Sequence, residues 1–350
     1  MRKTFVVTGI LFLMAIGWVV FFEIAPAQAA SGEKIKIELS CTQAPGTSID
    51  RAIGKFKSLV EERSDGRISV TLYRAGQLYN PKTEVEAIVK GALTMAALHP
   101  AFVGARAPVL EFIGSLGAQG CWVDRNHYWR FTDLPETREI AENEARIKIN
   151  AKILGMPSGG AGLVCNNKRP IHTVEGYKGL KLRVAGSAQA VLFRALGVVP
   201  VSMSAKEVYM ALQRGTVDGA SCNIERYYKS KWYEVAPYVT VDNSIPDINS
   251  WFVINLNFWN KLSKSDQQIL TQASRDIVEW TRTYSVKEDE ESYKKIQAGL
   301  VKDLFFLPKT EVAKLNKRAR PVMHELLTKR VGKETGDKIW SLLLDAAAEN

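Results

Sequence analysis

YKGLKLRVAGSAQAVLFRALGVVPVSMSAKEVYMALQRGTVDG, residues 177–219, is the stretch of sequence that decides the fold. Its beginning, residues 180–184, alternates leucine and valine with polar residues and carries a single arginine, Arg183, inside the run. Such alternation is typical of a strand that is buried on one face. Gly186 follows directly, at a place where a backbone can approach a ligand closely. We therefore expect the strand to end at a cleft and the Arg183 guanidinium to face it.

The rest of this stretch alternates helices with a short strand. Residues 188–196 have helical spacing and end at Gly197, a typical helix terminator. A short apolar strand follows, and Ser204 with Glu207 forms a capping box that predicts the start of a second helix, ending at Gly215. The order strand, helix, strand, helix predicts an α/β fold.

The same alternation occurs nearer the N-terminus. Apolar residues at period two predict strands, and apolar residues at helical spacing predict helices between them. The expected elements are a strand at 35–39, a helix at 49–60, a strand at 68–72, a helix at 81–91 and an apolar strand within 92–98. This repetition predicts a second α/β lobe with a largely parallel sheet.

These motifs resemble a known family. Residues 177–219 are similar to the solute-binding subunits of tripartite ATP-independent periplasmic (TRAP) transporters of the DctP type, with the patterns GLK-x-RV, G-x-x-P-V-x-M and E-x-Y-x-A-L-Q-x-G-x-V-D-G. Residues 67–91 and the segment from Phe252 resemble the family more loosely. The resemblance implies a two-lobed periplasmic solute-binding fold with hinge-crossing strands and a long helix that spans both lobes. It also implies that Arg183 binds the carboxylate of a substrate.

The chain, at 350 residues, is long enough for two lobes. A glycine pair after Pro157 predicts one crossing between lobes, and the apolar strand at 251–255 predicts the return. We expect these divisions: signal peptide 1–29, lobe I 30–158 and 249–288, and lobe II 159–248 and 289–350.

Residues 264–298 contain neither glycine nor proline and begin with the capping pair Ser263 and Asp266. A helix of this length would reach about 50 Å and would span both lobes. The alternative is two helices with a break around 284–288.

The N-terminus predicts export. Arg2 and Lys3 precede an apolar run at residues 5–22, and Ala27 with Ala29 forms an A-x-A cleavage site before Ala30. We expect cleavage and a periplasmic mature protein, with an uncleaved membrane anchor as the alternative.

Four cysteines accompany this export signal, namely Cys41, Cys121, Cys165 and Cys222. An oxidising compartment permits disulfides, with three possible pairings, and buried free thiols are the alternative. No spacing typical of a metal site occurs among them.

Composition and motifs argue against nucleic-acid binding and catalysis. The formal net charge is +10, but basic and acidic residues are interleaved, so we expect no nucleic-acid partner. His324-Glu325 begins like a zinc HExxH motif, but Thr328 stands where the second histidine is required. Without a nucleophile elbow or a phosphate loop, we expect no enzyme and no cofactor, and an exported hydrolase would have to be shown by turnover.

With nucleic-acid binding and catalysis set aside, the function that remains is recognition of a small organic acid. A guanidinium matches the two oxygens of a carboxylate, and Arg183 is our principal candidate; the alternative is an Arg183–Asp218 salt bridge. Other candidates lie in three places. Some lie at strand ends, and others follow the VDG turn, where the resemblance implies side chains around the ligand. The last is a tryptophan at the crossing, which either stacks on the ligand or belongs to the hinge core. They are Gln43, Gln77, His99 and Phe102 at strand ends, Cys222, Asn223 and Tyr227 after the turn, and Trp251 at the crossing.

The sequence departs from the family pattern in two places. Many relatives carry a second arginine where this chain has Gly162, and the VDG turn continues as Ala220-Ser221-Cys222-Asn223. These departures favour a monocarboxylate, or a 2-oxo or hydroxy acid, over a C4-dicarboxylate. We expect a monomer, and the resemblance implies a receptor that delivers its ligand to TRAP membrane permease subunits driven by an ion gradient. The alternative is a periplasmic ligand-binding partner of a sensor or chemoreceptor.

Overall fold

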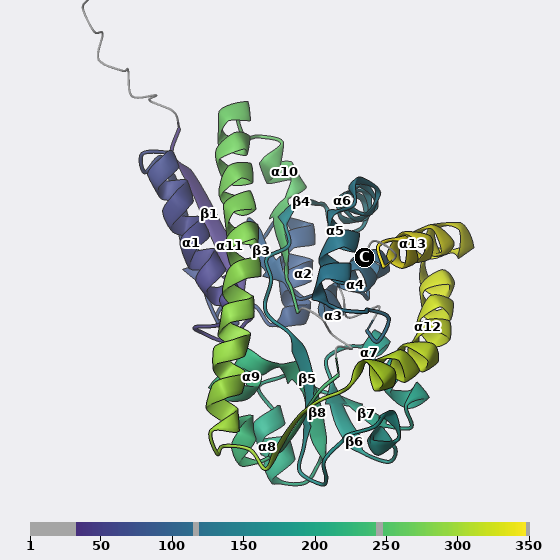
Figure 1. Ribbon diagram of the computed structural model, residues 1–350. Helices are drawn as coiled ribbons and strands as arrows, with labels where there is room; N and C mark the ends of the chain where they lie inside the picture. The colour runs from purple at the N-terminus through teal and green to yellow at the C-terminus, as the bar shows by residue number, and fades with distance from the viewer. Residues whose placement is uncertain (1–32, 115–118, 243–247, 348–350) are drawn as a thin grey trace, which may run out of the picture. The chain divides into compact units, whose positions relative to one another are not determined.

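The computed structural model describes residues 33–114, 119–242 and 248–347 (Figure 1). The predicted signal peptide, 1–29, lies outside the described residues. All elements below belong to one unit, Lys34–Asn350, which contains two β-sheets. No helix in the described ranges is long and apolar enough to cross a membrane.

The first sheet has the strand order β2-β1-β3-β10-β4 and, with the helices packed on it, forms lobe I. Its strands are β1 (Ile35–Cys41), β2 (Ile68–Tyr73), β3 (Met95–Leu98), β4 (Ala151–Gly155) and β10 (Trp251–Asn255). β1 is parallel to β2 and β3, as the alternating pattern predicted, whereas the crossing strand β10 is antiparallel to β3 and β4.

The second sheet has the order β11-β9-β5-β8-β6-β7 and forms lobe II. Its strands are β5 (Gly162–Asn166), β6 (Lys181–Val184), β7 (Val199–Ser202), β8 (Gly219–Asn223), β9 (Tyr238–Val241) and β11 (Asp303–Phe306). β6 is parallel to both β7 and β8, so the carboxyl ends of β6 and β8 meet at one edge of the sheet.

Helices connect these strands. Lobe I has α1 (Ser48–Arg63), α2 (Pro81–Lys90), α3 (Pro100–Val103), α4 (Pro108–Ile113), α5 (Arg125–Asp133), α6 (Pro135–Ile149) and α10 (Leu256–Trp259), and lobe II has η2 (Val174–Tyr177), α7 (Ser187–Ala195), α8 (Val208–Gln213), α9 (Ile224–Lys229) and η3 (Trp232–Glu234). Capping residues explain where such helices begin and end, as α2 shows. Asn80 caps α2 by accepting hydrogen bonds from the backbone of Lys82 and Thr83, and Gly91 ends it at a φ of 71°.

One uninterrupted helix, α11 (Lys264–Gln297), connects the two lobes. It begins at Ser263, whose side chain accepts a hydrogen bond from the backbone N–H of Asp266. It packs on α1 and β4 in lobe I and on α9 in lobe II (Figure 1). The prediction of a single helix that spans both lobes is confirmed, and the expected alternative, a break around 284–288, does not occur.

The chain crosses between the lobes where Ser158 pairs with Asn249 in an isolated antiparallel bridge. A β-carbon on Gly159 would lie 2.2 Å from the carbonyl oxygen of Ile248, so only glycine fits at this position. The backbone N–H of Ala161 donates to the Asp289 carboxylate on α11 at 2.9 Å. The crossing segment is therefore fastened to the long helix.

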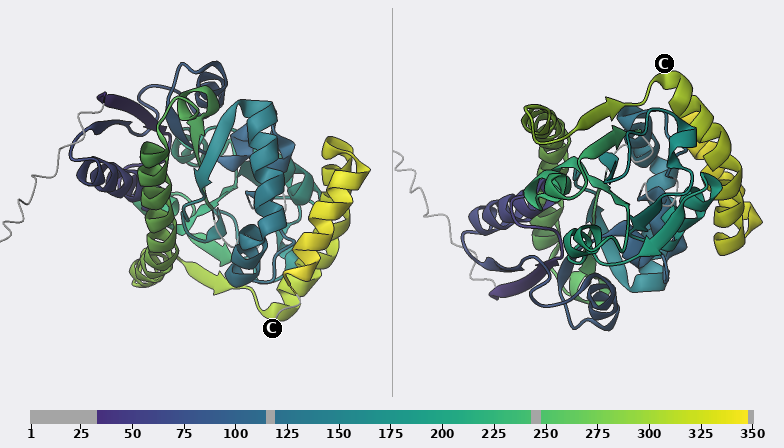
Figure 2. Two further views of the ribbon diagram at one scale, coloured as in Figure 1. Left: turned by 90° about the horizontal axis from the view of Figure 1, so that it is seen from above. Right: turned by 90° about the horizontal axis from the view of Figure 1, so that it is seen from below.

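The C-terminal helices α12 (Lys309–Val331) and α13 (Lys333–Asp345) lie on the other side of the molecule from α11 (Figure 2). α12 packs on α7 of lobe II and also on α4 of lobe I. A ring nitrogen of His127 on α5 is 2.7 Å from the carbonyl oxygen of Leu343 on α13. The segment 289–350, expected in lobe II, therefore also contains contacts with lobe I.

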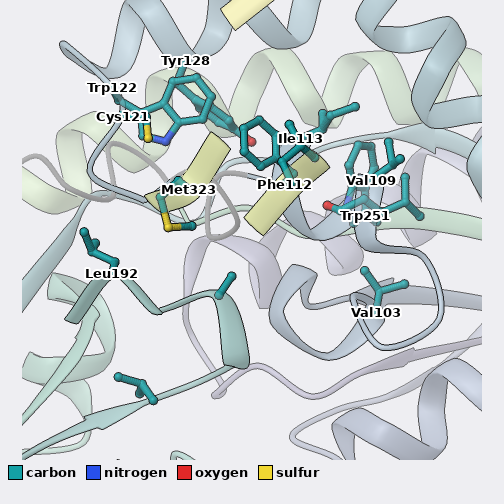
Figure 3. Packing of buried hydrophobic residues seen from close by; sticks show 14 of the residues in the cluster. Val103, Val109, Phe112, Ile113, Cys121, Trp122, Tyr128, Leu192, Trp251 and Met323 are labelled. Carbon is teal, nitrogen blue, oxygen red and sulfur yellow. The ribbon is translucent and has the colours of Figure 1, made fainter. Parts of the chain in front are cut away.

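The largest hydrophobic cluster includes residues from both lobes and from α12 (Figure 3). Trp122 and Tyr128 come from lobe I, Leu192 from α7 of lobe II, and Met323 from α12. Trp122 and Tyr128 meet edge to face, with ring centroids 4.9 Å apart. This shared core joins the two lobes and α12.

Candidate ligand-binding site

A cavity of about 360 Å³ lies where the carboxyl ends of β1 and β3 in lobe I face those of β6 and β8 in lobe II. This volume is within the range of small-molecule sites. Six of the nine residues proposed from the sequence line it: Gln43, His99, Phe102, Arg183, Cys222 and Asn223. Because these residues come from both lobes, a molecule in the cavity would contact both.

Arg183 is the central charged residue of this cavity and is 5% exposed. Its Nε donates to the Met203 carbonyl oxygen at 3.0 Å, and its Nη1 donates to the Ser221 carbonyl oxygen at 3.1 Å. Burial lowers the pKa of Arg183 to about 10, so the group stays charged at neutral pH. The two main-chain contacts fix the orientation of the guanidinium.

Arg183 does not pair with an acid. Asp218, the alternative partner considered from the sequence, instead accepts a hydrogen bond from the backbone of Lys181 at 2.8 Å and lies 3.5 Å from the Lys168 ammonium. Among the described residues no carboxylate is within ion-pair distance of the Arg183 guanidinium. The charge is therefore left for a ligand.

His99 contributes a neutral ring beside this guanidinium. Its Nδ1 caps the short helix α3 by accepting from the backbone N–H of Ala101 at 3.2 Å. Burial, together with the nearby Arg183 and Arg226 charges, lowers the pKa of His99 to about 3. The imidazole is thus uncharged at neutral pH, and Phe102 packs against its edge with the ring centroids 5.5 Å apart.

A second arginine, Arg226, also lines the cavity and was not among the residues proposed from the sequence. It lies in the first turn of α9, where its backbone N–H donates to the capping side chain of Asn223 at 3.0 Å. Its Nη2 donates to Gln43 Oε1 in the opposite lobe at 2.9 Å. The capping pattern at Asn223 was the sequence signal that could have placed Arg226 at the same strand end.

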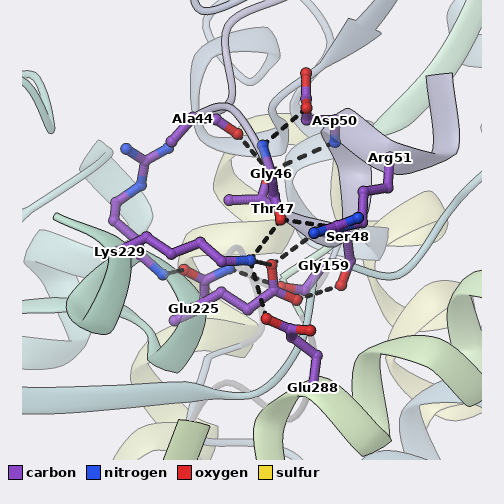
Figure 4. A network of polar contacts seen from close by, with 12 residues as sticks. Ala44, Gly46, Thr47, Ser48, Asp50, Arg51, Gly159, Glu225, Lys229 and Glu288 are labelled. Carbon is purple, nitrogen blue, oxygen red and sulfur yellow. Dashed lines mark hydrogen bonds and ion pairs between the residues drawn. The ribbon is translucent and has the colours of Figure 1, made fainter. Parts of the chain in front are cut away.

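Residues next to Arg226 connect α9 to the start of α1 (Figure 4). The buried Glu225 carboxylate accepts hydrogen bonds from the backbone N–H and the hydroxyl of Ser48, the former at 2.7 Å. Lys229 donates to the Gly46 carbonyl oxygen at 2.5 Å and lies 3.0 Å from the Glu288 carboxylate. The two lobes are thus in polar contact along one side of the cavity.

Gln189 and Ser221 are two further lining residues that sequence reasoning missed. The Gln189 side chain accepts from the backbone N–H of Ala185 at 2.7 Å and donates to the Ser221 hydroxyl at 3.4 Å. Neither residue type stands out in a sequence, because glutamine and serine are common in helices and strands of any protein.

The other three residues proposed from the sequence do not line the cavity. Gln77 is exposed and accepts a hydrogen bond from the backbone of Arg74 at 3.1 Å. The buried Tyr227 hydroxyl donates to the Ala236 carbonyl oxygen at 2.8 Å. Trp251 belongs to the core, where its indole N–H donates to the Leu110 carbonyl oxygen at 2.8 Å. We leave these three out of the site proposed below.

The four cysteines are free and buried thiols. Burial raises the pKa of the Cys41, Cys121 and Cys222 thiols, so they are protonated and unreactive at neutral pH. The sequence left two alternatives, disulfides and buried free thiols, and the structure contains the free thiols.

A larger cavity, of about 500 Å³, lies beside α6, β4 and α11 in lobe I. Charged residues line it, but most are paired with one another. The Asp133 carboxylate binds both Arg138 and Arg282, and Lys152 binds Glu142. Because these pairs neutralise each other, we take the smaller cavity, with its unpaired guanidinium, as the candidate site.

Metal binding has no support in the described parts of the chain, which contain no group of three suitable ligands. The His324 ring, part of the incomplete zinc motif, instead lies 2.9 Å from the Asp337 carboxylate.

The comparisons with known proteins agree with this architecture. The model of the DctP family, described as bacterial extracellular solute-binding protein, family 7, matches residues 39–330. The C4-dicarboxylate-binding periplasmic protein DctP of Rhodobacter capsulatus is 29% identical over 313 residues, covering 87% of this chain and 90% of that protein. The sialic acid-binding periplasmic protein SiaP of Vibrio cholerae is 28% identical over 237 residues, covering 66% and 70%.

A solved structure has the same fold. The crystal structure of a TRAP periplasmic solute-binding protein from Desulfovibrio salexigens with bound orotic acid superposes with a TM-score of 0.81. It is 20% identical in sequence, and the match covers 90% of this chain and 99% of that one. The predicted fold is therefore confirmed, and the chain belongs to the DctP family, family 7 of the bacterial extracellular solute-binding proteins.

Proposed function

We propose that this protein is the extracytoplasmic receptor of a TRAP transporter, and that it binds a small organic acid in the cavity between its lobes. The observation that carries the proposal is Arg183. This buried guanidinium is held by two main-chain carbonyl oxygens, lines the cavity, and has no acidic partner within the described structure.

Charge and geometry make a carboxylate the natural ligand of such a group. A guanidinium presents parallel N–H donors that match the two oxygens of a carboxylate. Nε and Nη1 of Arg183 are engaged with the backbone, and Nη2 has no partner among the described residues, so it can donate to a ligand. Because His99 is uncharged, it can add a hydrogen bond without adding another positive charge.

The names of the relatives support an organic acid. One relative is named for C4-dicarboxylates and another for sialic acid, and neighbouring structures contain orotic acid and succinate. All these ligands carry a carboxylate. Delivery to membrane permease subunits and a periplasmic location are part of the same proposal, since both follow from family membership.

Binding would stabilise the arrangement in which the lobes are in contact. The ligand would contact Arg183 in lobe II and Gln43 and His99 in lobe I, so it would bind the closed arrangement more tightly than an open one. The crossing segments around Ser158 and Asn249 would serve as the hinge.

The test is a calorimetric titration of the mature protein with a panel of organic acids, repeated with Arg183→Ala. We expect at least one acid to bind, and the variant to lose about 10-fold or more in affinity because a charge-assisted contact is removed. Arg320→Ala is a matched control, because Arg320 lies on α12 outside the cavity and also donates to a main-chain carbonyl, that of Cys121 at 3.3 Å.

Two results would contradict the proposal. The first is that no acid in the panel binds the folded wild-type protein, and the second is that an acid binds Arg183→Ala as tightly as the wild type and the control. Turnover of a bound acid would instead indicate an enzyme.

A further inference from the structure

The two lobes are joined by apolar contacts on one side and by polar contacts on the other. Beside α12, the largest hydrophobic cluster contains residues of both lobes, such as Trp122 and Leu192. Beside α11, on which α1 and α9 both pack, the start of α1 meets α9 through hydrogen bonds (Figure 4). Water can replace a hydrogen bond at a small net cost, whereas separated apolar surfaces stay exposed. The polar side is therefore the one that separates more easily.

We call these polar contacts the α9 seam, which joins residues 225–229 of lobe II to residues 43–48 of lobe I. The Glu225 carboxylate accepts hydrogen bonds from the backbone N–H and the hydroxyl of Ser48, the former at 2.7 Å. Lys229, one turn further along α9, donates to the Gly46 carbonyl oxygen at 2.5 Å. The seam thus holds the first turn of α1 and the loop before it.

The α9 seam continues into the wall of the cavity. Arg226 donates to Gln43 Oε1 at 2.9 Å, and both of these residues line the cavity. Ala44 and Pro45, which follow Gln43 in sequence, line it as well. The contacts of α9 therefore keep this segment of lobe I against lobe II at the edge of the ligand space.

The seam is complete without a ligand, because all its contacts are made within the chain. Glu225 and Ser48 are both 0% exposed, so each replaces the water that the other has lost. The Lys229 ammonium lies 3.0 Å from the Glu288 carboxylate on α11 and 3.7 Å from that of Glu225. A hydrogen bond to a charged group shifts an equilibrium by about 10-fold or more. Contacts of this kind are strong enough to keep an empty receptor closed.

We propose that the α9 seam is a latch that keeps the lobes closed without a ligand, and that its opening controls how fast ligands enter and leave. Glu225 and Lys229 are then positioning residues, since neither is among the described lining residues and they act through residues 43–48. The latch makes the same contacts in the empty and the occupied receptor, so it should change binding rates much more than affinity. The kinetic part of this inference rests on the proposed function, whereas closure of the empty protein does not.

Lys229→Met tests the latch in stopped-flow experiments with succinate, orotate and galactonate, the acids bound in neighbouring structures. Trp232 lines the cavity, so its fluorescence can report binding. The variant loses the contact with Gly46 but keeps the buried pair of Glu225 and Ser48, so it should fold. A closed receptor must open before a ligand enters. We therefore expect association and dissociation rate constants both about 10-fold larger than in the wild type, with Kd changed by less than about 3-fold.

Lys57→Met is the matched control. Lys57 also donates to a main-chain carbonyl oxygen, that of Val70 at 2.7 Å, and pairs with a glutamate, Glu61, but all three residues belong to lobe I. Its replacement removes the same charge and should leave both rate constants unchanged. Glu225→Gln keeps an acceptor for Ser48, so it should accelerate binding and release less than Glu225→Ala does.

Hydrogen exchange of the ligand-free protein tests closure without any ligand. The acceptor of the Ser48 backbone N–H is Glu225 in the other lobe, so this N–H should be protected in the wild type and exchange about 10-fold faster in Lys229→Met. The Arg51 N–H is an internal reference, because it donates to the Thr47 carbonyl oxygen within lobe I at 2.9 Å. Its exchange should be the same in both proteins.

Three results would overturn the latch. The first is fast exchange at Ser48 in the ligand-free wild type, which would mean that the empty receptor is open. The second is a Lys229→Met variant in which only dissociation accelerates and Kd weakens in proportion, because the seam would then close only on a ligand. The third is unchanged rate constants, which would leave the seam a purely structural role. If none of the three acids binds, hydrogen exchange still decides whether the empty protein is closed, and the proposed function fails only if the wider panel of acids also gives no binding.

Discussion

Arg183 keeps its charge inside the protein because carbonyl oxygens replace the water that it loses. Met203 and Ser221 each accept one of its hydrogen bonds, and both acceptors are part of the backbone of lobe II. Backbone acceptors hold the group in one orientation without cancelling its charge, which an aspartate would do. This arrangement favours an anionic ligand over a structural salt bridge.

Glu84 shows the opposite treatment of a buried charge. This residue of α2 is fully buried, and among the described residues its carboxyl accepts one hydrogen bond, from the Ser40 hydroxyl at 2.5 Å. Burial raises the pKa of Glu84 to about 8, so the group is mostly protonated at neutral pH. The Glu84 carboxyl therefore lowers the free energy of unfolding only at pH values at which it ionises.

We predict that Glu84→Gln stabilises the protein at alkaline pH. The folded protein binds the Glu84 proton more tightly than the unfolded chain, so this group's contribution to the free energy of unfolding falls as pH rises from 4.5 to about 8. Glutamine cannot ionise, so the variant should gain stability over the wild type, of the order of 4 kcal/mol at pH 8 and little at pH 4.5.

Chemical denaturation at several pH values measures this difference. Glu86→Gln is the control, because Glu86 is exposed on the same helix and pairs with Arg106. If the stabilities of the wild type and of Glu84→Gln change in parallel from pH 4.5 to 8, Glu84 titrates normally and the prediction is wrong.

Sequence reasoning found six residues that line the cavity but not their hydrogen-bond partners. Arg183 stood out as a charge in an apolar strand, and Gln43, His99 and Phe102 were placed by the rule that ligands bind at the carboxyl ends of strands. Arg226 was missed because its position depends on how α9 faces lobe I, which no local pattern encodes. The sequence also could not show that β10 is a central, fully buried strand, which places Trp251 in the core.

At the scale of elements, the start of α1 is capped from the other lobe. The Glu225 carboxylate on α9 accepts from the first backbone N–H of the helix, at Ser48, and a negative charge at a helix N-terminus is favourable. This contact connects lobe II to lobe I independently of any ligand.

Glu225→Ala should therefore destabilise the protein by about 1–3 kcal/mol, since it leaves the buried N–H and hydroxyl of Ser48 without an acceptor. Denaturant unfolding without ligand measures the loss. Glu291→Ala, an exposed carboxylate that pairs with Lys295 on α11, should change stability by less than about 0.5 kcal/mol. Equal effects of the two substitutions would mean that the interlobe cap contributes nothing.

The crossing segment makes a second prediction at this scale. Gly159→Ala would place a methyl group 2.2 Å from the Ile248 carbonyl oxygen, so the backbone must shift. We expect a loss of about 1–3 kcal/mol, typical of overpacking, with weaker ligand binding as well. Gly54→Ala on α1 is the control, because its nearest neighbour is the flexible end of the Arg74 side chain at 3.1 Å. Unchanged thermal unfolding of Gly159→Ala would contradict this account of the crossing.

Elements with strong local signals were predicted best. The caps at Asn80 and Ser263 begin α2 and α11 where expected. The helix expected from Ser204 begins only at Val208, although the Glu207 side chain makes the predicted capping contact and accepts from the Ser204 backbone N–H at 2.9 Å. α12 has Pro321 in its interior, a residue that predicts a break, and it stays helical because tertiary packing holds it.

At the scale of the whole molecule, four connections join the lobes: the crossing strands, α11, the C-terminal pair α12 and α13, and the contacts of α9 with the start of α1. Lobes joined in this way should unfold together. A ligand in the cavity between them should then stabilise the entire unit.

We predict that a bound acid raises the free energy of unfolding of both lobes, by about 2.7 kcal/mol at a ligand concentration 100 times its Kd. Hydrogen exchange checks this, because protection should increase in core strands of lobe I, such as β1, as well as in β8 of lobe II. Increased protection confined to lobe II would mean that the ligand does not join the two lobes.

A crystal structure of the mature protein with the acid that binds most tightly tests the central claim most directly. We predict that a carboxylate of the ligand accepts a hydrogen bond from the Arg183 guanidinium in the cavity between the lobes. A ligand bound elsewhere, with Arg183 still held only by the Met203 and Ser221 carbonyl oxygens, would contradict it.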